Sequence, residues 1–153
     1  METVFKLVKK SGVDGVFVSV RCSLRAFELM LGKEYIVETW TSADDEALDL
    51  GYGLTVFTEI EDMCCFLDKQ DWEGDDHVLV CLTSNLWKPT VPILYFHDRG
   101  YEEITSVRDF LAVVPKCEGV SKDWPKRTFM CGNLYVIGDL GNVSDLLVRY
   151  KKM

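Results

Sequence analysis

The strongest constraint on the fold is an alternation of apolar and polar residues close to the N-terminus. Residues 3–9 (TVFKLVK) and 16–21 (VFVSVR) both show it. A period of two residues is typical of a strand that buries one of its faces. The intervening residues 11–15 (SGVDG) supply the glycines and the aspartate that favour a tight turn. These residues therefore predict an antiparallel hairpin at the start of the fold.

Hydrophobic periodicity and capping residues divide the rest of the chain into short strands and short helices. Further strands are predicted at 35–40, 54–57, 77–83, 93–97 and 128–137. Helices are predicted at 23–31, 60–68, 106–114 and 143–150, with one or two further helical turns within 41–51. The apolar runs 77–83 and 93–97 are expected to be central strands, and Gly132 is expected to bend the last strand.

Strands and helices do not alternate regularly along the sequence, which argues against a doubly wound parallel sheet. The expected fold class is α+β: a mixed, mainly antiparallel curved sheet of about seven strands, with about four short helices packed at its side. The chain has 153 residues, 48% of them hydrophobic, and a domain of this length buries about 70% of its surface. No repeat or linker interrupts it, so residues 1–153 are expected to form one domain.

The chain is acidic, with 25 Asp and Glu against 17 Lys and Arg and a formal net charge of −8. No block of lysine or arginine is available to neutralise a phosphate backbone, so nucleic acid is not expected as a partner. The locally basic residues 149–152 (RYKK) fit the C-terminal end of a helix, where cations complement the helix dipole. The acidic charge instead favours a basic partner protein.

The first residues lack the basic and then apolar layout of a signal peptide, and no apolar run approaches the roughly 20 residues that span a bilayer. We therefore expect a cytoplasmic protein without membrane association. The six cysteines would then lie in a reducing compartment, where thiols act mainly as small buried hydrophobes. They are Cys22, Cys64, Cys65, Cys81, Cys117 and Cys131.

Standard catalytic signatures do not occur in the sequence, which has no glycine-rich phosphate loop, no His-Glu-x-x-His, no Cys-x-x-Cys and no Gly-x-Ser-x-Gly. The sharpest catalytic hypothesis is a thiol nucleophile, with His97 as its base and Cys81, Cys117 or Cys131 attacking. Cys117, in a predicted loop, is the thiol expected to be most accessible. With six cysteines and two histidines, however, some such pairing arises by chance. No catalytic residue, metal or cofactor is therefore assigned.

Several aromatic residues fall in predicted loops beside acidic ones. A tryptophan in a loop either covers the core locally or anchors a binding partner, because it offers a large apolar face and one polar group. The candidate binding residues are Trp72, Trp87, Trp124, Tyr52, Tyr101, Asp75 and Asp76. The first hypothesis is a non-enzymatic module that binds a protein, which the acidic charge suggests is basic. A homodimer also remains open, because an uncovered sheet edge is a natural pairing site.

Three segments resemble a known kind of domain. Residues 32–37 (GKEYIV), 53–58 (GLTVFT) and 134–140 (LYVIGDL) are similar to a pattern in small uncharacterised accessory domains of phages and large DNA viruses. The resemblance implies an accessory factor that binds a host protein in the host cytosol.

Such domains look distantly like the split sheets of ADP-ribosyltransferases. That likeness implies an alternative function, a small enzyme or a nucleotide-binding domain. The residues that can be nominated for it are Tyr35, Tyr52 and Glu102. No Arg/Ser/Glu or His/Tyr/Glu constellation accompanies them.

Overall fold

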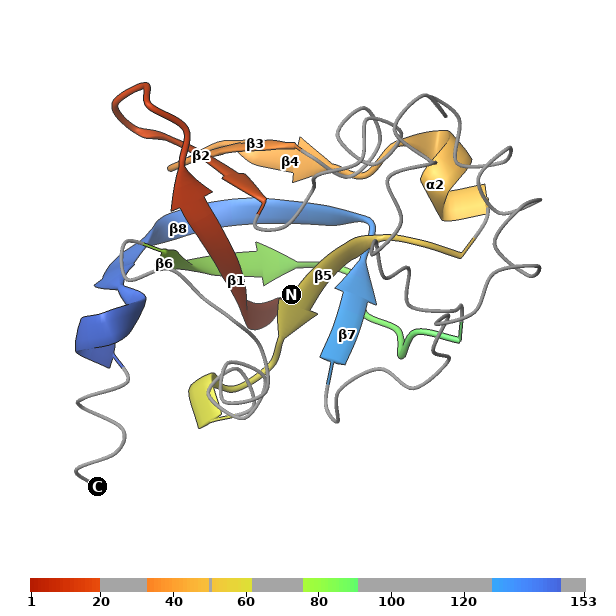
Figure 1. Cartoon of the computed structure of the whole chain (residues 1–153). Coiled ribbons are helices and arrows are strands. Elements are labelled where there is room, and N and C mark those ends of the chain that lie inside the picture. Colours follow the sequence, from red (N-terminus) through yellow and green to blue (C-terminus); the bar gives the residue numbers. More distant parts are fainter. Residues whose placement is uncertain (20–32, 50, 62–75, 91–127, 147–153) are drawn as a thin grey trace, which may run out of the picture.

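The computed structural model describes residues 1–19, 33–49, 51–61, 76–90 and 128–146 (Figure 1). Within these ranges, eight strands form a single antiparallel sheet. The strands are β1 (Glu2–Lys10), β2 (Val16–Ser19), β3 (Glu34–Ile36), β4 (Trp40–Ser42), β5 (Leu54–Phe57), β6 (His77–Thr83), β7 (Thr128–Cys131) and β8 (Asn133–Asn142), and helix α2 spans Asp45–Asp49.

Six strands follow one another across the sheet in the order β3-β2-β1-β6-β8-β4. Strand β6, predicted to be central, lies between β1 and β8, and its ladder with β1 runs from Glu2↔Thr83 to Val8↔His77. Strand β5 joins β1 at a single pair, Phe5↔Phe57, and carries β7 on its other side. The sheet therefore has a long main path and a two-stranded branch beside β1.

The opening hairpin predicted from the sequence is confirmed. Strands β1 and β2 pair antiparallel with Lys10 opposite Phe17. Gly12 and Gly15 have φ angles of 95° and 78°, a conformation that residues with a Cβ rarely adopt. Ser11 Oγ holds the turn by donating to the carbonyl oxygen of Val16 at 2.8 Å.

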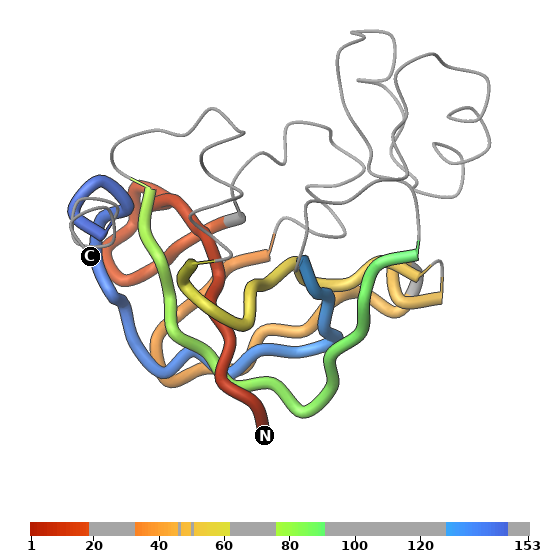
Figure 2. Tube along the Cα trace, turned by 90° about the horizontal axis from the view of Figure 1, so that it is seen from below, coloured from red at the N-terminus to blue at the C-terminus, as the bar shows by residue number. Residues whose placement is uncertain are grey.

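The two outermost strands of the main path, β3 and β4, are joined directly by residues 37–39. The prediction of one continuous strand over 35–40 is wrong, because Glu38 adopts the left-handed conformation with φ 62°. The chain reverses there. The Thr41 hydroxyl then donates to the carbonyl oxygen of Glu34 at 2.9 Å and ties β4 to β3. Because this hydrogen bond joins the first strand of the main path to its last, the sheet curls on itself (Figure 2).

Strand β8 contains two β-bulges. In its ladder with β6, Val136 lies opposite Cys81 while Gly138 lies opposite Val80, so Ile137 has no partner of its own. A second irregularity lies between Asp139 and Gly141, where Leu140 likewise has no residue opposite it on β6. Bulges bend a strand and increase its twist, which suits a sheet that curls on itself.

The C-terminal strand region differs in part from its prediction. The chain bends at Gly132 as expected, but the bend divides the predicted strand 128–137 into two: β7 ends at Cys131 and β8 begins at Asn133. The last strand is predicted to end at Ile137, yet β8 continues to Asn142. Pairing with β6 holds this glycine-containing segment extended through both bulges.

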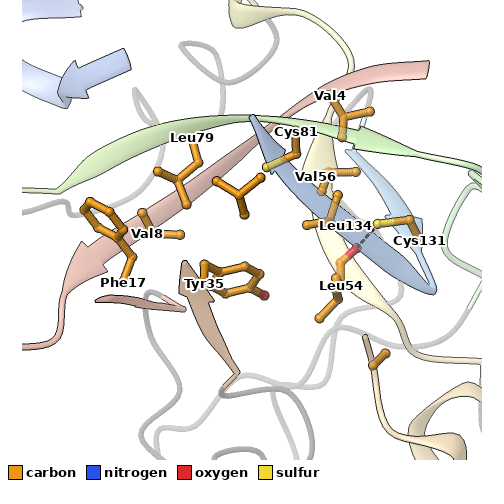
Figure 3. Packing of buried hydrophobic residues seen from close by; sticks show 12 residues of the cluster. Val4, Val8, Phe17, Tyr35, Leu54, Val56, Leu79, Cys81, Cys131 and Leu134 are labelled. Atoms are coloured by element: carbon orange, nitrogen blue, oxygen red, sulfur yellow. Dashed lines mark hydrogen bonds between the residues drawn. The ribbon is translucent and has the colours of Figure 1, made fainter. Parts of the chain in front are cut away.

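The curled sheet encloses most of the apolar core. On β1, Val4 and Val8 face the inside, whereas Phe5 and Leu7 face the outside. The inner core comprises Val4, Val8, Phe17, Tyr35, Ala43, Leu54, Val56, Leu79, Cys81, Cys131, Leu134 and Val136 (Figure 3). A smaller outer cluster comprises Leu7, Phe57, Val78, Val143 and Leu146.

The expected fold class is wrong. Of the described residues, 56% lie in strands and only 13% in short helices, so the structure is mostly antiparallel sheet rather than four helices packed on a sheet. The one or two helical turns predicted within 41–51 are present as α2, Asp45–Asp49, and Gly51 beyond the helix has a φ of 90°. The predicted helices 23–31 and 106–114 and the strand 93–97 lie outside the described residues. No helix in the described ranges has the length and apolar character needed to cross a bilayer.

Candidate functional site

Two of the residues predicted to bind a partner, Tyr52 and Asp76, are buried. Their exposed fractions are 2% and 1%. After α2 the amide of Tyr52 donates to the carbonyl oxygen of Ala47 at 2.8 Å, and this turn carries the ring into the interior. Burial raises the pKa of the Tyr52 phenol to about 12. Neither side chain presents a surface to a partner.

Trp87 is half-buried, and its backbone is bridged to Met130 in both directions, at 2.9 and 2.8 Å. Its indole ring lies directly over Gly53, where a Cβ atom would come within 2.8 Å of the ring. The tryptophan therefore covers the junction of β5 and β7. The other predicted binding residues, Trp72, Trp124, Tyr101 and Asp75, lie outside the described residues.

A buried lysine crosses the inner core. Lys6 is 7% exposed, its ammonium donates to the carbonyl oxygen of Thr55 at 2.8 Å, and it lies 5.7 Å from the centre of the Tyr35 ring. Tyr35 itself is fully buried. Its ring therefore packs in the core beside a cation, an arrangement that stabilises both groups. Glu102, nominated with Tyr35 for the nucleotide-binding alternative, lies outside the described residues.

The two thiols in the described ranges, Cys81 and Cys131, are fully buried in the inner core (Figure 3). Burial raises the pKa of Cys81 to about 12, and it raises that of Cys131 to about 11. The sulfur of Cys131 donates to the carbonyl oxygen of Leu54 at 3.6 Å. A nucleophilic cysteine needs its thiolate, so both thiols serve packing. Cys117 and His97 lie outside the described residues.

The raised pKa values predict that stability falls at alkaline pH. Above the ordinary thiol pKa of 9.0, Cys81 and Cys131 lose their protons in the unfolded chain but keep them in the folded one. The unfolded state then binds fewer protons, so the free energy of unfolding decreases as the pH rises from 9 towards 11. Each thiol contributes at most about 1.4 kcal/mol per pH unit. Urea unfolding at several pH values measures this slope. The Cys81→Ala variant should show a shallower slope, and an unchanged slope would contradict the assignment.

A histidine and an aspartate pair across the second bulge. Nδ1 of His77 lies 3.0 Å from Oδ2 of Asp139, and Oδ1 of Asp139 accepts the amide of Gly141 at 2.7 Å. The His77 ring also lies against Phe17, with 5.5 Å between ring centres. These contacts hold β6, β8 and β2 together where the ladder is irregular. In the described part of the chain, no group of three or more His, Cys, Asp and Glu side chains is placed to hold a metal ion.

Four exposed apolar side chains and the half-buried Tyr135 lie on the segments where the 37–39 turn meets β8. We define the outer strip as Ile36, Val37, Trp40, Tyr135 and Ile137. Trp40 is 49% exposed and Ile137 is 44% exposed. Trp40 and Tyr135 are directly opposite each other in the β4–β8 ladder. The centres of their rings are 5.4 Å apart, and the ring planes are tilted by 59°.

The backbone under the outer strip is firmly held. The amide of Glu38 donates to the carbonyl oxygen of Val136 at 2.7 Å, and the amide of Val136 donates to the carbonyl oxygen of Thr39 at 3.2 Å. The first bulge of β8 places Ile137 beside this turn. The strip therefore presents an exposed tryptophan, a half-buried tyrosine and exposed aliphatic groups on a hydrogen-bonded backbone.

Sequence reasoning missed the outer strip because all of its residues fall in predicted strands, where apolar residues are assigned to the core. One signal was available. Tyr35 and Ile36 are adjacent in a strand and so point to opposite faces, which means that one of these apolar side chains must face outward. Here Tyr35 is the buried residue and Ile36 is 39% exposed.

A comparison of the chain with protein-family models, curated proteins and solved structures found no match. The resemblance to accessory domains of phages and large DNA viruses accordingly stays a prediction.

Proposed function

We propose that this protein is a non-enzymatic interaction module that binds a partner protein through the outer strip. The observation that carries the proposal is the exposed Trp40, paired with the half-buried Tyr135 and set among Ile36, Val37 and Ile137. Tryptophan and tyrosine are the residues most enriched among those that dominate binding energy at protein interfaces. A contiguous exposed apolar patch on a folded domain is typical of an interaction site.

The rigidity of the strip supports the same proposal. The turn that carries Val37 is hydrogen-bonded to β8, so little conformational freedom remains to be lost when a partner binds. In keeping with the resemblance to viral accessory domains, we place the partner among host proteins of the cytosol. The buried Cys81 and Cys131 thiols give no support to thiol catalysis within the described residues.

Site-specific photo-crosslinking tests this proposal in the cells in which the protein is naturally made. We expect p-benzoylphenylalanine at position 137 to give discrete protein adducts that are lost when Trp40→Ala is added. Trp40 is 49% exposed, so this substitution should change the free energy of unfolding by only about 1 kcal/mol.

A photo-crosslinker at position 9 is the matched control. Lys9 is exposed on β1, away from the β4–β8 ladder that carries Trp40. Adducts at position 9 equal to those at position 137, or adducts at position 137 that survive Trp40→Ala, would overturn the proposed binding surface.

A further inference from the structure

The charged side chains of the two described segments that carry the outer strip are all acidic, and Lys33, just before the first segment, is paired with Asp44. Residues 34–42 and 133–142, which include β3, β4 and β8, contain three charged side chains, Glu34, Glu38 and Asp139, and no lysine or arginine. Asp139 is paired with His77 at 3.0 Å. Glu34 and Glu38 are exposed at the two ends of the segment that carries Ile36 and Val37.

The acidic residues beside the outer strip favour some kinds of binding partner over others. A second copy of the chain docked strip to strip would bring the same carboxylates together, in a protein whose formal net charge is already −8. Like charges facing each other across an interface oppose association, whereas a partner of opposite charge is attracted and oriented as it approaches. A basic partner therefore fits the strip better than a homodimer or an acidic protein.

We infer that the partner of the outer strip is a basic protein segment, with an apolar side chain that packs on Trp40 and Tyr135 and lysine or arginine residues that reach Glu34 and Glu38. This inference rests on the proposed function and adds the chemistry of the partner to it. The aromatic faces favour the same cations, because lysine and arginine are attracted to the face of an indole ring. The apolar contact supplies affinity, and the carboxylates supply orientation and selectivity.

A displayed library of random peptides tests the inference while the natural partner is still unidentified. Peptides are selected on the folded wild-type protein after depletion on the Trp40→Ala variant. We expect the enriched peptides to carry net positive charge together with aromatic or aliphatic residues. Enriched peptides that depend on Trp40 but are neutral or acidic would overturn the basic partner and leave the binding surface in place. If no peptide depends on Trp40, both the inference and the proposed function fail.

Calorimetry on one enriched peptide then tests the two carboxylates directly. The Glu34→Gln/Glu38→Gln variant should bind it about tenfold more weakly at low salt, and added salt should remove most of that difference. The Asp14→Asn/Asp45→Asn variant changes the net charge equally at exposed positions outside the strip. Equal weakening in both variants would show a general charge effect and would overturn the assigned role of Glu34 and Glu38.

Discussion

The Gly53→Ala variant is expected to lose about 3 kcal/mol or more of folding free energy, at or above the upper end of what overpacking a core usually costs. A Cβ atom at position 53 would lie 2.6 Å from the backbone oxygen of Cys131 and 2.8 Å from the indole ring of Trp87. The oxygen belongs to β7, which pairs with β5 through Leu54↔Cys131, so relief requires the two strands to separate. Urea unfolding followed by circular dichroism measures the loss.

Gly138→Ala is the matched control for this substitution. Its added Cβ would meet only Cγ1 of Val80, at an ordinary contact distance of 3.9 Å. Alanine also restricts the unfolded chain, so this variant should lie within about 1 kcal/mol of the wild type and could be more stable. An unfolding midpoint for Gly53→Ala as high as that of Gly138→Ala would show that β5, β7 and Trp87 do not approach as closely as described.

The second large effect is expected at Leu79. This side chain is fully buried in the inner core, on the strand between β1 and β8. Leu79→Ala removes apolar contacts and leaves a cavity in a closely packed interior, which costs about 2–5 kcal/mol. Thermal and urea unfolding of the purified variant should both show the loss.

Leu140→Ala removes the same atoms from a neighbouring position on β8. Leu140 is 39% exposed at the second bulge, so its truncation should cost less than about 1 kcal/mol. Comparable losses for Leu79→Ala and Leu140→Ala would mean that the inside and the outside of the sheet have been assigned incorrectly at this point.

Strands with a strong local pattern, either an alternation of apolar and polar residues or a short apolar run, could be predicted from the sequence. The opening hairpin, residues 54–57 and residues 77–83 were all recognised from local pattern. Prediction from local pattern failed where pairing between strands distant in the sequence determines the backbone conformation. Hydrogen bonds with the backbone of Val136 hold the turn at Glu38, and pairing with β6 keeps the segment after Ile137 extended despite its glycines.

The candidate site was harder to predict than the fold, because exposure depends on three-dimensional packing. Aromatic residues beside glycine and acidic residues were assigned to loops at the surface, yet Tyr52 is buried by the turn after α2. Trp40 was assigned to the end of the predicted strand 35–40 and was not among the candidate binding residues, yet it faces solvent beside Tyr135. Neither outcome follows from composition or periodicity, since these do not determine whether an aromatic ring faces the core or the solvent.

The position of β8 between β6 and β4 has a consequence for synthesis on the ribosome. Residues 133–142 are translated after every other described strand, and β4, one of their two partners, is separated from them by residues 43–132. Until β8 emerges from the exit tunnel, the sheet cannot close, and the inner faces of the nascent strands lack their cover. We therefore expect folding to occur late and nearly all at once, with a period beforehand in which the nascent chain depends on chaperones to avoid aggregation.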